Sequence, residues 1–362
     1  MAGLNEPFTV GDLTVPNRIV MAPMTRTASP GGVPGPDVAE YYARRAAHRV
    51  GLIVTEGTYV DRPAAGAYDD VPHFHGESAL AGWAHVVRRV HEAGGRIIPQ
   101  LWHTGAARTA TEPPAEVPSG IGLDGGPAGR AMTQRDIDAA LAAFAEAAAT
   151  AERLGFDGVE LHGAHGYLID NFLWSVTNRR TDRYGGDPAS RARFGAEVVR
   201  AVRAAVGPGF PVFFRLSQWK VGRYEARTAQ SPDELAQLLT PLTEAGVDVF
   251  HGSTRRYRLP EFEGSALNLA GWIRRLTGRP TVTVGSVGLE RQYGEGDFTS
   301  GFTGPSGVAG IEELVARLER DEFDLVAVGR SLLANPDWAE LALGGELDRA
   351  APYDPSVLRT LA

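Results

Sequence analysis

Three polar side chains close a short apolar stretch near the middle of the chain. The run Val159–Leu161 is followed by His162, His165 and Tyr167, with small residues between them. A run of this kind predicts a buried strand, which would deliver the three side chains at its C-terminal end. Two histidines and a tyrosine gathered in one place could bind a metal, or could hold an oxygen atom and supply a proton.

Metal binding is the first chemistry to weigh. His162 and His165 have a His-x-x-His spacing, and Glu160 or Asp170 could add a carboxylate ligand for zinc or iron. Such a site would suit a metal-dependent hydrolase or lyase on the His162/His165 pair. No carboxylate is evident at the other predicted strand ends near the pair, which weakens this interpretation.

The second chemistry is the binding of an oxygen atom combined with proton donation. Two histidine N–H groups can grip a substrate oxygen. A tyrosine, with a reference pKa of about 10, is protonated at neutral pH and can act as a general acid. A structural alternative is that His162, His165 and Tyr167 are satisfied polar groups under a loop. The three residues by themselves leave these interpretations open.

Eight short apolar runs predict the strands that would position these groups. Helical patterns lie between the runs, and the clearest begins at Thr133, where Asp136 completes a capping box. No glycine fingerprint follows the first run, which argues against a doubly wound sheet. We therefore predict one (β/α)8 TIM barrel over residues 1–362. The predicted strands are Ile19–Ala22, Leu52–Thr55, Arg96–Leu101, Val159–Leu161, Val212–Leu216, Val247–Phe250, Thr281–Val284 and Leu325–Val328.

The segments around these strands add a hairpin and three long loops. Apolar and polar residues alternate on both sides of Gly11-Asp12, which predicts a β-hairpin before the barrel. Loops that follow strands line the catalytic face of a barrel, so long ones are expected to form walls or lids. The long loops follow strands three, four and seven, at Thr104–Ala131, His162–Ser190 and Tyr293–Gly310.

The ends of the last two predicted strands favour a phosphate site. Gly285 and Ser286 follow strand seven, and Gly329 and Arg330 follow strand eight. Many barrels bind phosphate at these two positions through backbone N–H groups. The small residues permit close approach, and the arginine adds a charge-assisted hydrogen bond.

Two further polar residues lie in apolar strands. Arg215 ends a run that begins Val-Phe-Phe, and a buried arginine must meet an anion. That anion is either a barrel carboxylate such as Glu160 or a ligand that becomes negatively charged. Gln100 offers both a donor and an acceptor, which suits the edge of a heterocycle as well as a structural role.

Composition narrows the classes of function. The 362 residues are 43% hydrophobic, carry a net charge of −8 and include no cysteine. The acidic balance argues against a nucleic-acid partner, and no apolar run reaches the 18 residues of a membrane span. The chain starts without a secretory signal, so we expect a cytoplasmic protein. Without cysteine there is no thiolate or iron–sulfur site, so redox chemistry would need an organic cofactor or a metal on nitrogen and oxygen ligands.

Longer motifs are spread along the chain at Asn17–Arg26, Thr55–Gly57, Pro99–Gly105, Gly158–Leu168, Asn178–Gly186 and Val328–Asp337. They resemble those of the old yellow enzymes, and the similarity runs from the first hairpin to the last barrel helix. These are FMN-dependent ene-reductases on a (β/α)8 barrel, reduced by NADH or NADPH and then reducing activated C=C bonds. The resemblance implies tightly bound, non-covalent FMN and a small activated alkene, such as an enone, as substrate, with nitro compounds as a further class.

The resemblance also implies a role for each matching residue. His162 and His165 would bind the substrate oxygen, and Tyr167 would protonate the carbon next to the activating group. Arg215 would lie near N1 and O2 of the flavin. The flavin ring would lie against Pro23, Met24, Thr25, Gly57 and Gln100. The phosphate would be held by Gly285, Ser286, Gly329 and Arg330.

Two residues depart from the pattern of any one branch of this family. The donor pair is His162 with His165, where yeast and plant-like members usually carry His-Asn. Thr25 stands where the branch rich in His-His pairs commonly carries cysteine, so the redox tuning of the flavin should differ. The branch, the preferred nicotinamide and the choice between monomer and homo-oligomer are left open. A flavin-binding sensor barrel without turnover is a further alternative.

Overall fold

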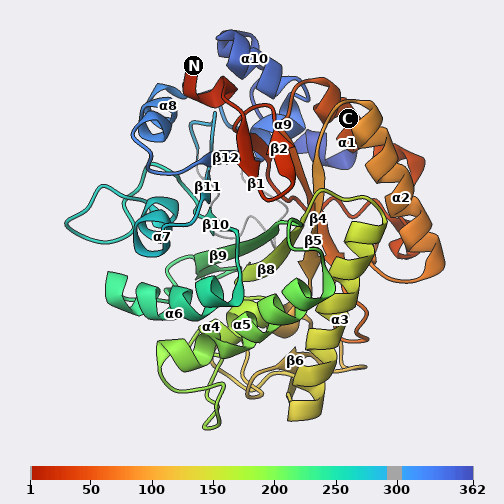
Figure 1. The fold of residues 1–362 in the computed structure, drawn as a ribbon, viewed down its shortest axis with the longest axis vertical. Coiled ribbons are helices and arrows are strands. Elements are labelled where there is room, and N and C mark those ends of the chain that lie inside the picture. The colour runs from red at the N-terminus through yellow and green to blue at the C-terminus, as the bar shows by residue number, and fades with distance from the viewer. Residues whose placement is uncertain (1, 292–303, 362) are drawn as a thin grey trace.

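A closed parallel barrel forms the centre of the computed structural model, which describes residues 2–291 and 304–361 (Figure 1). The strands follow one another around the ring in chain order, and the last pairs with the first. Each of the eight predicted strands is present, so the predicted (β/α)8 barrel is confirmed. They are β3 (Ile19–Met21), β4 (Leu52–Tyr59), β5 (Ile97–Trp102), β8 (Val159–His165), β9 (Val212–Lys220), β10 (Val249–Ser253), β11 (Thr281–Val284) and β12 (Leu325–Val328).

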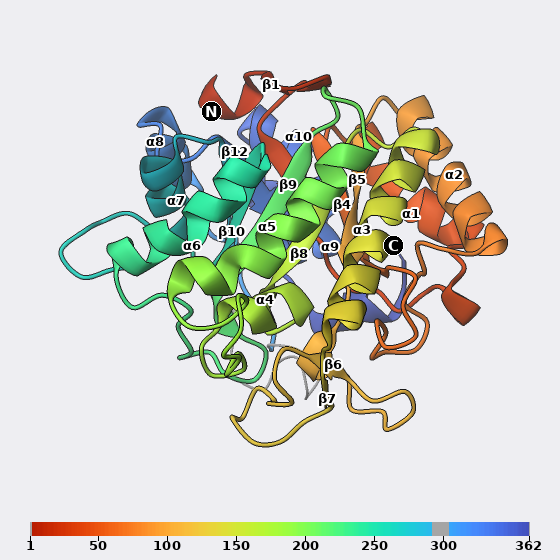
Figure 2. The same cartoon turned by 60° about the horizontal axis from the view of Figure 1, so that its bottom comes forward.

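Helices surround the barrel and cover the outer face of its strands (Figures 1 and 2). The capping box at Thr133 is present: its side chain accepts from the backbone N–H of Asp136, whose carboxylate accepts from the N–H of Thr133. The helices are α1 (Pro36–Ala47), α2 (Glu77–Glu92), α3 (Gln134–Arg153), α4 (Leu168–Leu173), α5 (Pro188–Ala205), α6 (Pro232–Ala245), α7 (Leu269–Thr277), α8 (Glu312–Glu319), α9 (Arg330–Ala334) and α10 (Trp338–Gly344). None of the helices in the described ranges is long and apolar enough to span a bilayer.

One helix begins later than its sequence pattern indicates. The pattern predicts a helix from Gly264 to Leu276, but α7 starts at Leu269. The side chain of Asn268 accepts a hydrogen bond from the N–H of Gly271 and so caps the helix. Gly264 has a φ of +75°, which is incompatible with a right-handed helix.

The predicted hairpin closes the bottom of the barrel. Strands β1 (Phe8–Val10) and β2 (Leu13–Val15) pair antiparallel, and Figure 1 shows them across the ring of strands. Leu13 and Val15 are buried in one apolar cluster with the residues inside the barrel. Because apolar side chains fill this end, the open end of the barrel is the one where the strands terminate.

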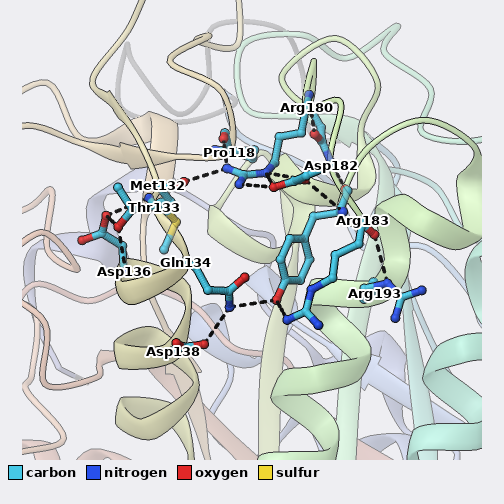
Figure 3. Close-up of polar contacts among 12 residues, drawn as sticks. Pro118, Met132, Thr133, Gln134, Asp136, Asp138, Arg180, Asp182, Arg183 and Arg193 are labelled. Atoms are coloured by element: carbon cyan, nitrogen blue, oxygen red, sulfur yellow. Dashed lines mark hydrogen bonds and ion pairs between the residues drawn. The ribbon is translucent and has the colours of Figure 1, made fainter.

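The loops that follow β5 and β8, the third and fourth strands of the barrel, are long and are hydrogen-bonded to each other. The first carries β6 (Glu116–Val117) and β7 (Arg130–Ala131), and the second carries α4. Arg180 in the second loop donates to the carbonyl oxygens of Pro118 and Met132 in the first, and it pairs with Asp182 (Figure 3). The motif Asn178–Gly186 therefore has a structural role, because it holds the two loops together at the open end of the barrel. The predicted loop Tyr293–Gly310 lies in part outside the described residues.

Candidate active site

A cavity of about 410 Å³ opens at the C-terminal ends of the barrel strands. This volume is within the range of small-molecule and cofactor sites, and every residue that the sequence predicts for the site lines it. The cavity therefore brings together predicted residues from seven of the eight barrel strands. The thirteen predicted residues are Pro23, Met24, Thr25, Gly57, Gln100, His162, His165, Tyr167, Arg215, Gly285, Ser286, Gly329 and Arg330.

One end of the cavity is basic and tightly built. Arg330 donates from Nη2 to the hydroxyl of Ser286 over 3.1 Å, and that hydroxyl donates to the carbonyl of Arg255. Gly285 has a φ of +146°, and a Cβ atom there would meet Oγ1 of Thr254 at 2.6 Å. A positive charge, a hydroxyl and glycine backbone in one place form an environment that suits a phosphate group.

Arg215 is buried and makes no ion pair with Glu160, although both lie in the described part of the chain. Glu160 instead accepts from Nε2 of Gln100 and from Nδ1 of His251, each over 2.7 Å. Arg215 donates from Nη2 to Ser253, and its Nη1 has no hydrogen bond among the described residues and, unlike the buried Nε, is not sealed from the cavity. A buried guanidinium with an unused donor fits a ligand that gathers negative charge.

The histidine pair and the tyrosine form one wall of the cavity. Ring centroids lie 5.2 Å apart for His162 and His165, and 4.8 Å apart for His162 and Tyr167. Trp102 packs edge-on against Tyr167 at 4.7 Å and lies nearly parallel to His162 at 5.8 Å. The three rings that the sequence predicts to act together are therefore in direct contact.

Burial keeps both histidines neutral. Loss of hydration lowers the pKa of His162 and of His165 well below the ordinary value, and the guanidinium of Arg215 lowers both further. A neutral imidazole has one N–H donor and one acceptor nitrogen. The pair thus offers two uncharged donors, the kind of group that stabilises a developing oxyanion.

A β-bulge aims His165 into the cavity. The register between β8 and β9 shifts after Gly163, and His165 has a φ of +65°, an uncommon value for a residue with a side chain. Its backbone N–H donates to the hydroxyl of Ser217, and its carbonyl accepts from the N–H of Val221. These bonds hold a strained conformation, which is frequent at functional sites.

A buried ion pair supports the next residue of this bulge. Lys220 and Asp170 lie 2.8 Å apart and are both fully buried. Asp170 accepts the N–H of Gly166 over 2.6 Å, and Lys220 also donates to Thr228. The pair thereby fixes the turn between His165 and Tyr167.

Sequence reasoning missed several residues of the cavity wall, three of which carry hydroxyl groups of interest. Tyr68, Ser253 and Tyr353 all line the cavity. Burial raises the pKa of Tyr68, and a hydrogen bond with Tyr167 opposes that rise. Ser253 is the last residue of β10 and could have been found as a hydroxyl at a strand end. Tyr68 and Tyr353 lie on loops, and the sequence pattern does not predict where a loop residue lies relative to the barrel.

The metal hypothesis finds no ligand set. Glu160, its proposed third ligand, is engaged by Gln100 and His251, and Asp170 is paired with Lys220. Within residues 2–291 and 304–361, no group of three or more histidine, aspartate or glutamate side chains is arranged to hold a metal ion. The alternative of a metal-dependent hydrolase or lyase is therefore not supported.

Comparison with known proteins gives matches over nearly the whole chain. The model of the NADH:flavin oxidoreductase / NADH oxidase family matches residues 3–293. An NADH oxidase of Thermoanaerobacter brockii is 33% identical over 350 residues, which are 93% of this chain and only 50% of that protein. 12-Oxophytodienoate reductase 7 of Oryza sativa subsp. japonica is 32% identical over 368 residues, 94% of this chain and 87% of the relative.

A solved structure agrees with these matches. Morphinone reductase in complex with tetrahydroNAD superposes with a TM-score of 0.80 at 31% identity, over 98% of this chain and 94% of that one. The family match, the shared barrel and the cavity with a basic end all support the same family assignment. This chain belongs to the FMN-dependent NADH:flavin oxidoreductase family, the old yellow enzymes.

Proposed function

We propose that residues 1–362 form one FMN-binding barrel domain that takes hydride from NADH or NADPH and reduces C=C bonds activated by a carbonyl or nitro group. The observation that carries this proposal is the wall of neutral His162, neutral His165 and Tyr167 in the same cavity as the Arg215 guanidinium, whose Nη1 has no hydrogen bond among the described residues. Bound FMN supplies the hydride for the alkene. A cytoplasmic location, with no nucleic-acid or membrane partner, stays a prediction.

The residues around the cavity fit FMN at three places. The phosphate would be held by Ser286 and Arg330 together with the backbone of Gly285 and Gly329. Arg215, whose Nη1 has no hydrogen bond in the described ranges and is not sealed from the cavity, would face the part of the ring that gathers negative charge on reduction. Flat contact with the ring would come from Pro23, Met24, Thr25, Gly57 and Gln100. At Gly57 a Cβ atom would meet the Trp102 ring at 2.4 Å, so the backbone there has no room for a side chain.

The polar wall would act on the substrate. The N–H donors of His162 and His165 would hold the oxygen of the activating group and stabilise the negative charge that develops on it, typically by about 3 kcal/mol for each donor. Tyr167 would donate its proton to the carbon next to the activating group. Tyr68, hydrogen-bonded to Tyr167, would orient that hydroxyl.

Spectroscopy of the purified protein tests this function. We expect a yellow protein with about one FMN per chain, bleached anaerobically by NADH or NADPH and recoloured by 2-cyclohexenone. A colourless protein that cannot be reconstituted with FMN would refute the proposal. Reduction by nicotinamide without reoxidation by any of a panel of enones and nitroalkenes would instead favour the sensor alternative.

A further inference from the structure

Ser253 touches both the histidine wall and the buried arginine. It is the last residue of β10, it lines the cavity, and only 2% of its surface is exposed. Its Oγ lies 2.8 Å from Nε2 of His165 and 3.3 Å from Nη2 of Arg215. One hydroxyl group thus joins a side chain that would hold the substrate to a side chain that would face the flavin.

The directions of these two hydrogen bonds follow from what each group can donate. A guanidinium has only donors, so the Ser253 oxygen accepts from Arg215. Ser253 has one hydroxyl proton, and of the two described groups within hydrogen-bond distance of its Oγ only Nε2 of His165 can accept it. If Nε2 carried the proton instead, the buried hydroxyl proton would lose its acceptor, which is unfavourable away from water.

We propose that Ser253 is a positioning residue that holds His165 in the tautomer protonated at Nδ1, so that Nδ1–H is the donor His165 offers to the substrate oxygen. This inference deepens the proposed function and rests on it. Nδ1 of His165 has no hydrogen bond within the described chain and is not sealed from the cavity, whereas Nδ1 of His162 is sealed. The two histidines therefore present different nitrogens to the cavity, Nε2 from His162 and Nδ1 from His165.

Trp219 fixes the orientation of the plane of the His165 ring. Its indole lies nearly parallel to the His165 ring, with centroids 4.2 Å apart and planes inclined by 26°. The indole is held in turn, because its Nε1 donates to the backbone carbonyl of Ser253 over 3.2 Å. Trp219 thus sets the plane of the imidazole, and the hydroxyl of Ser253 sets which edge faces the cavity.

The choice of tautomer matters because His165 is neutral. Burial, the adjacent Arg215 and the neighbouring His162, Lys220 and His251 all lower the pKa of His165. A neutral ring has a single N–H, so the tautomer decides whether the donor faces the substrate or the protein. Loss of the Ser253 hydroxyl would free the ring to place its proton on Nε2, and the cavity would then meet an acceptor.

The tautomer can be read directly by nitrogen NMR of the FMN-saturated protein labelled with 15N-histidine. The signals of His165 are assigned by their absence in His165→Gln. We expect the wild-type ring to show a protonated Nδ1 and an unprotonated, hydrogen-bonded Nε2. A wild-type ring protonated at Nε2 would overturn the proposal, and this outcome does not depend on any variant folding.

Ser253→Ala and Ser253→Thr test the cause. In Ser253→Ala we expect loss of the single tautomer and a Kd for 4-hydroxybenzaldehyde, a phenolic probe of the donor pair, raised by roughly 10- to 100-fold. Ser253→Thr keeps a hydroxyl and should restore both readouts. Ser29→Ala is the matched control, because it removes a buried hydroxyl that has no partner in the described ranges and does not line the cavity.

The outcomes separate this inference from the proposed function. An unchanged tautomer and unchanged probe binding in Ser253→Ala would overturn the role of Ser253, even in an active ene-reductase. A wild-type protein with no enone turnover, but with His165 protonated at Nδ1 and released by Ser253→Ala, would refute the proposed reaction and still support the role of Ser253.

Discussion

Tyr167 belongs to only one half of the proposed reaction, which makes its variant informative. We expect Tyr167→Phe to slow the reoxidation of reduced protein by 2-cyclohexenone by about 10²-fold or more, since a general acid contributes 10²–10⁴-fold. Reduction by NADH or NADPH involves no proton transfer to an alkene and should change far less. Stopped-flow absorbance measures the two half-reactions separately.

Tyr184→Phe is the control for this experiment. The hydroxyl of Tyr184 donates to Glu197 and does not line the cavity, so both half-reactions should keep their rates. Equal losses in the two half-reactions of Tyr167→Phe would contradict the assignment of Tyr167 as proton donor.

His162 is the donor whose contribution to binding can be isolated, because no described side chain shares a hydrogen bond with its ring. We expect His162→Ala to weaken the binding of 4-hydroxybenzaldehyde by about 10- to 100-fold, the equivalent of a charge-assisted hydrogen bond of 1.5–3 kcal/mol. Titration followed by flavin absorbance gives the Kd. His162→Gln, which retains an N–H donor, should recover part of the loss, and unchanged binding in His162→Ala would exclude the donor role.

At the scale of elements, the bulge in β8 depends on the ion pair between β9 and α4. Burial lowers the pKa of Lys220 and raises that of Asp170, so burial disfavours the charged form of each partner although each favours the charge of the other. Such a pair is weak evidence for stability, but breaking it leaves one group buried alone. We expect Lys220→Met to lower the free energy of unfolding by about 3–5 kcal/mol, measured by urea denaturation with FMN in excess.

The double variant Lys220→Met/Asp170→Asn completes this test. The asparagine side chain that replaces Asp170 would be neutral and could still accept the N–H of Gly166, so we expect the double variant to be more stable than Lys220→Met alone. If the double variant is no more stable, the cost lies in packing and the bulge is held by other contacts.

The elements of the barrel were predictable from the sequence because their patterns are local. Each strand is a short apolar run, and the capping box at Thr133 marks the start of α3 within one residue. The short helices α4 and α9 were missed, since six and five residues carry too little periodicity. The end of β8 was misplaced at Leu161, because the polar residues that continue the strand to His165 break the apolar pattern.

At the scale of the whole molecule, the sequence predicted which residues form the site and which strand ends carry them. It did not predict the hydrogen bonds that join these residues, because those depend on the fold. The sequence placed Arg215 and His165 on neighbouring strands, but the hydroxyl of Ser253 that joins them lies on a third strand. An ion pair of Arg215 with Glu160 was one of the two alternatives that the sequence left open, and Glu160 instead bonds Gln100 and His251. Contacts of this kind depend on barrel register, which no single run of sequence contains.

A buried carboxylate connects the stability of the whole barrel to pH. Glu56 in β4 accepts the backbone N–H groups of Arg26 and Thr27 through Oε2, and it thereby holds the loop that carries Thr25. Its Oε1 is buried without a partner in the described chain. Burial raises the pKa of Glu56 from 4.5 to about 7, and the two backbone bonds only partly oppose that rise.

The sign of the effect follows from the raised pKa. Between pH 4.5 and 7 the folded protein binds this proton more tightly than the unfolded chain, so the contribution of Glu56 to stability is present below pH 4.5 and is lost as pH rises through 7. We expect this group to cost the wild type on the order of 3 kcal/mol of unfolding free energy between pH 5 and pH 8. Glu56→Gln cannot titrate and should lack that loss, so its stability relative to the wild type should rise with pH. Urea denaturation at pH 5 and pH 8 with the same excess of FMN measures the difference, with Glu92→Gln at an exposed position as the control.

The contrary outcome is a difference between Glu56→Gln and wild type that does not vary with pH. It would mean that Glu56 is already ionised throughout this range, and that a full negative charge holds the loop bearing Thr25.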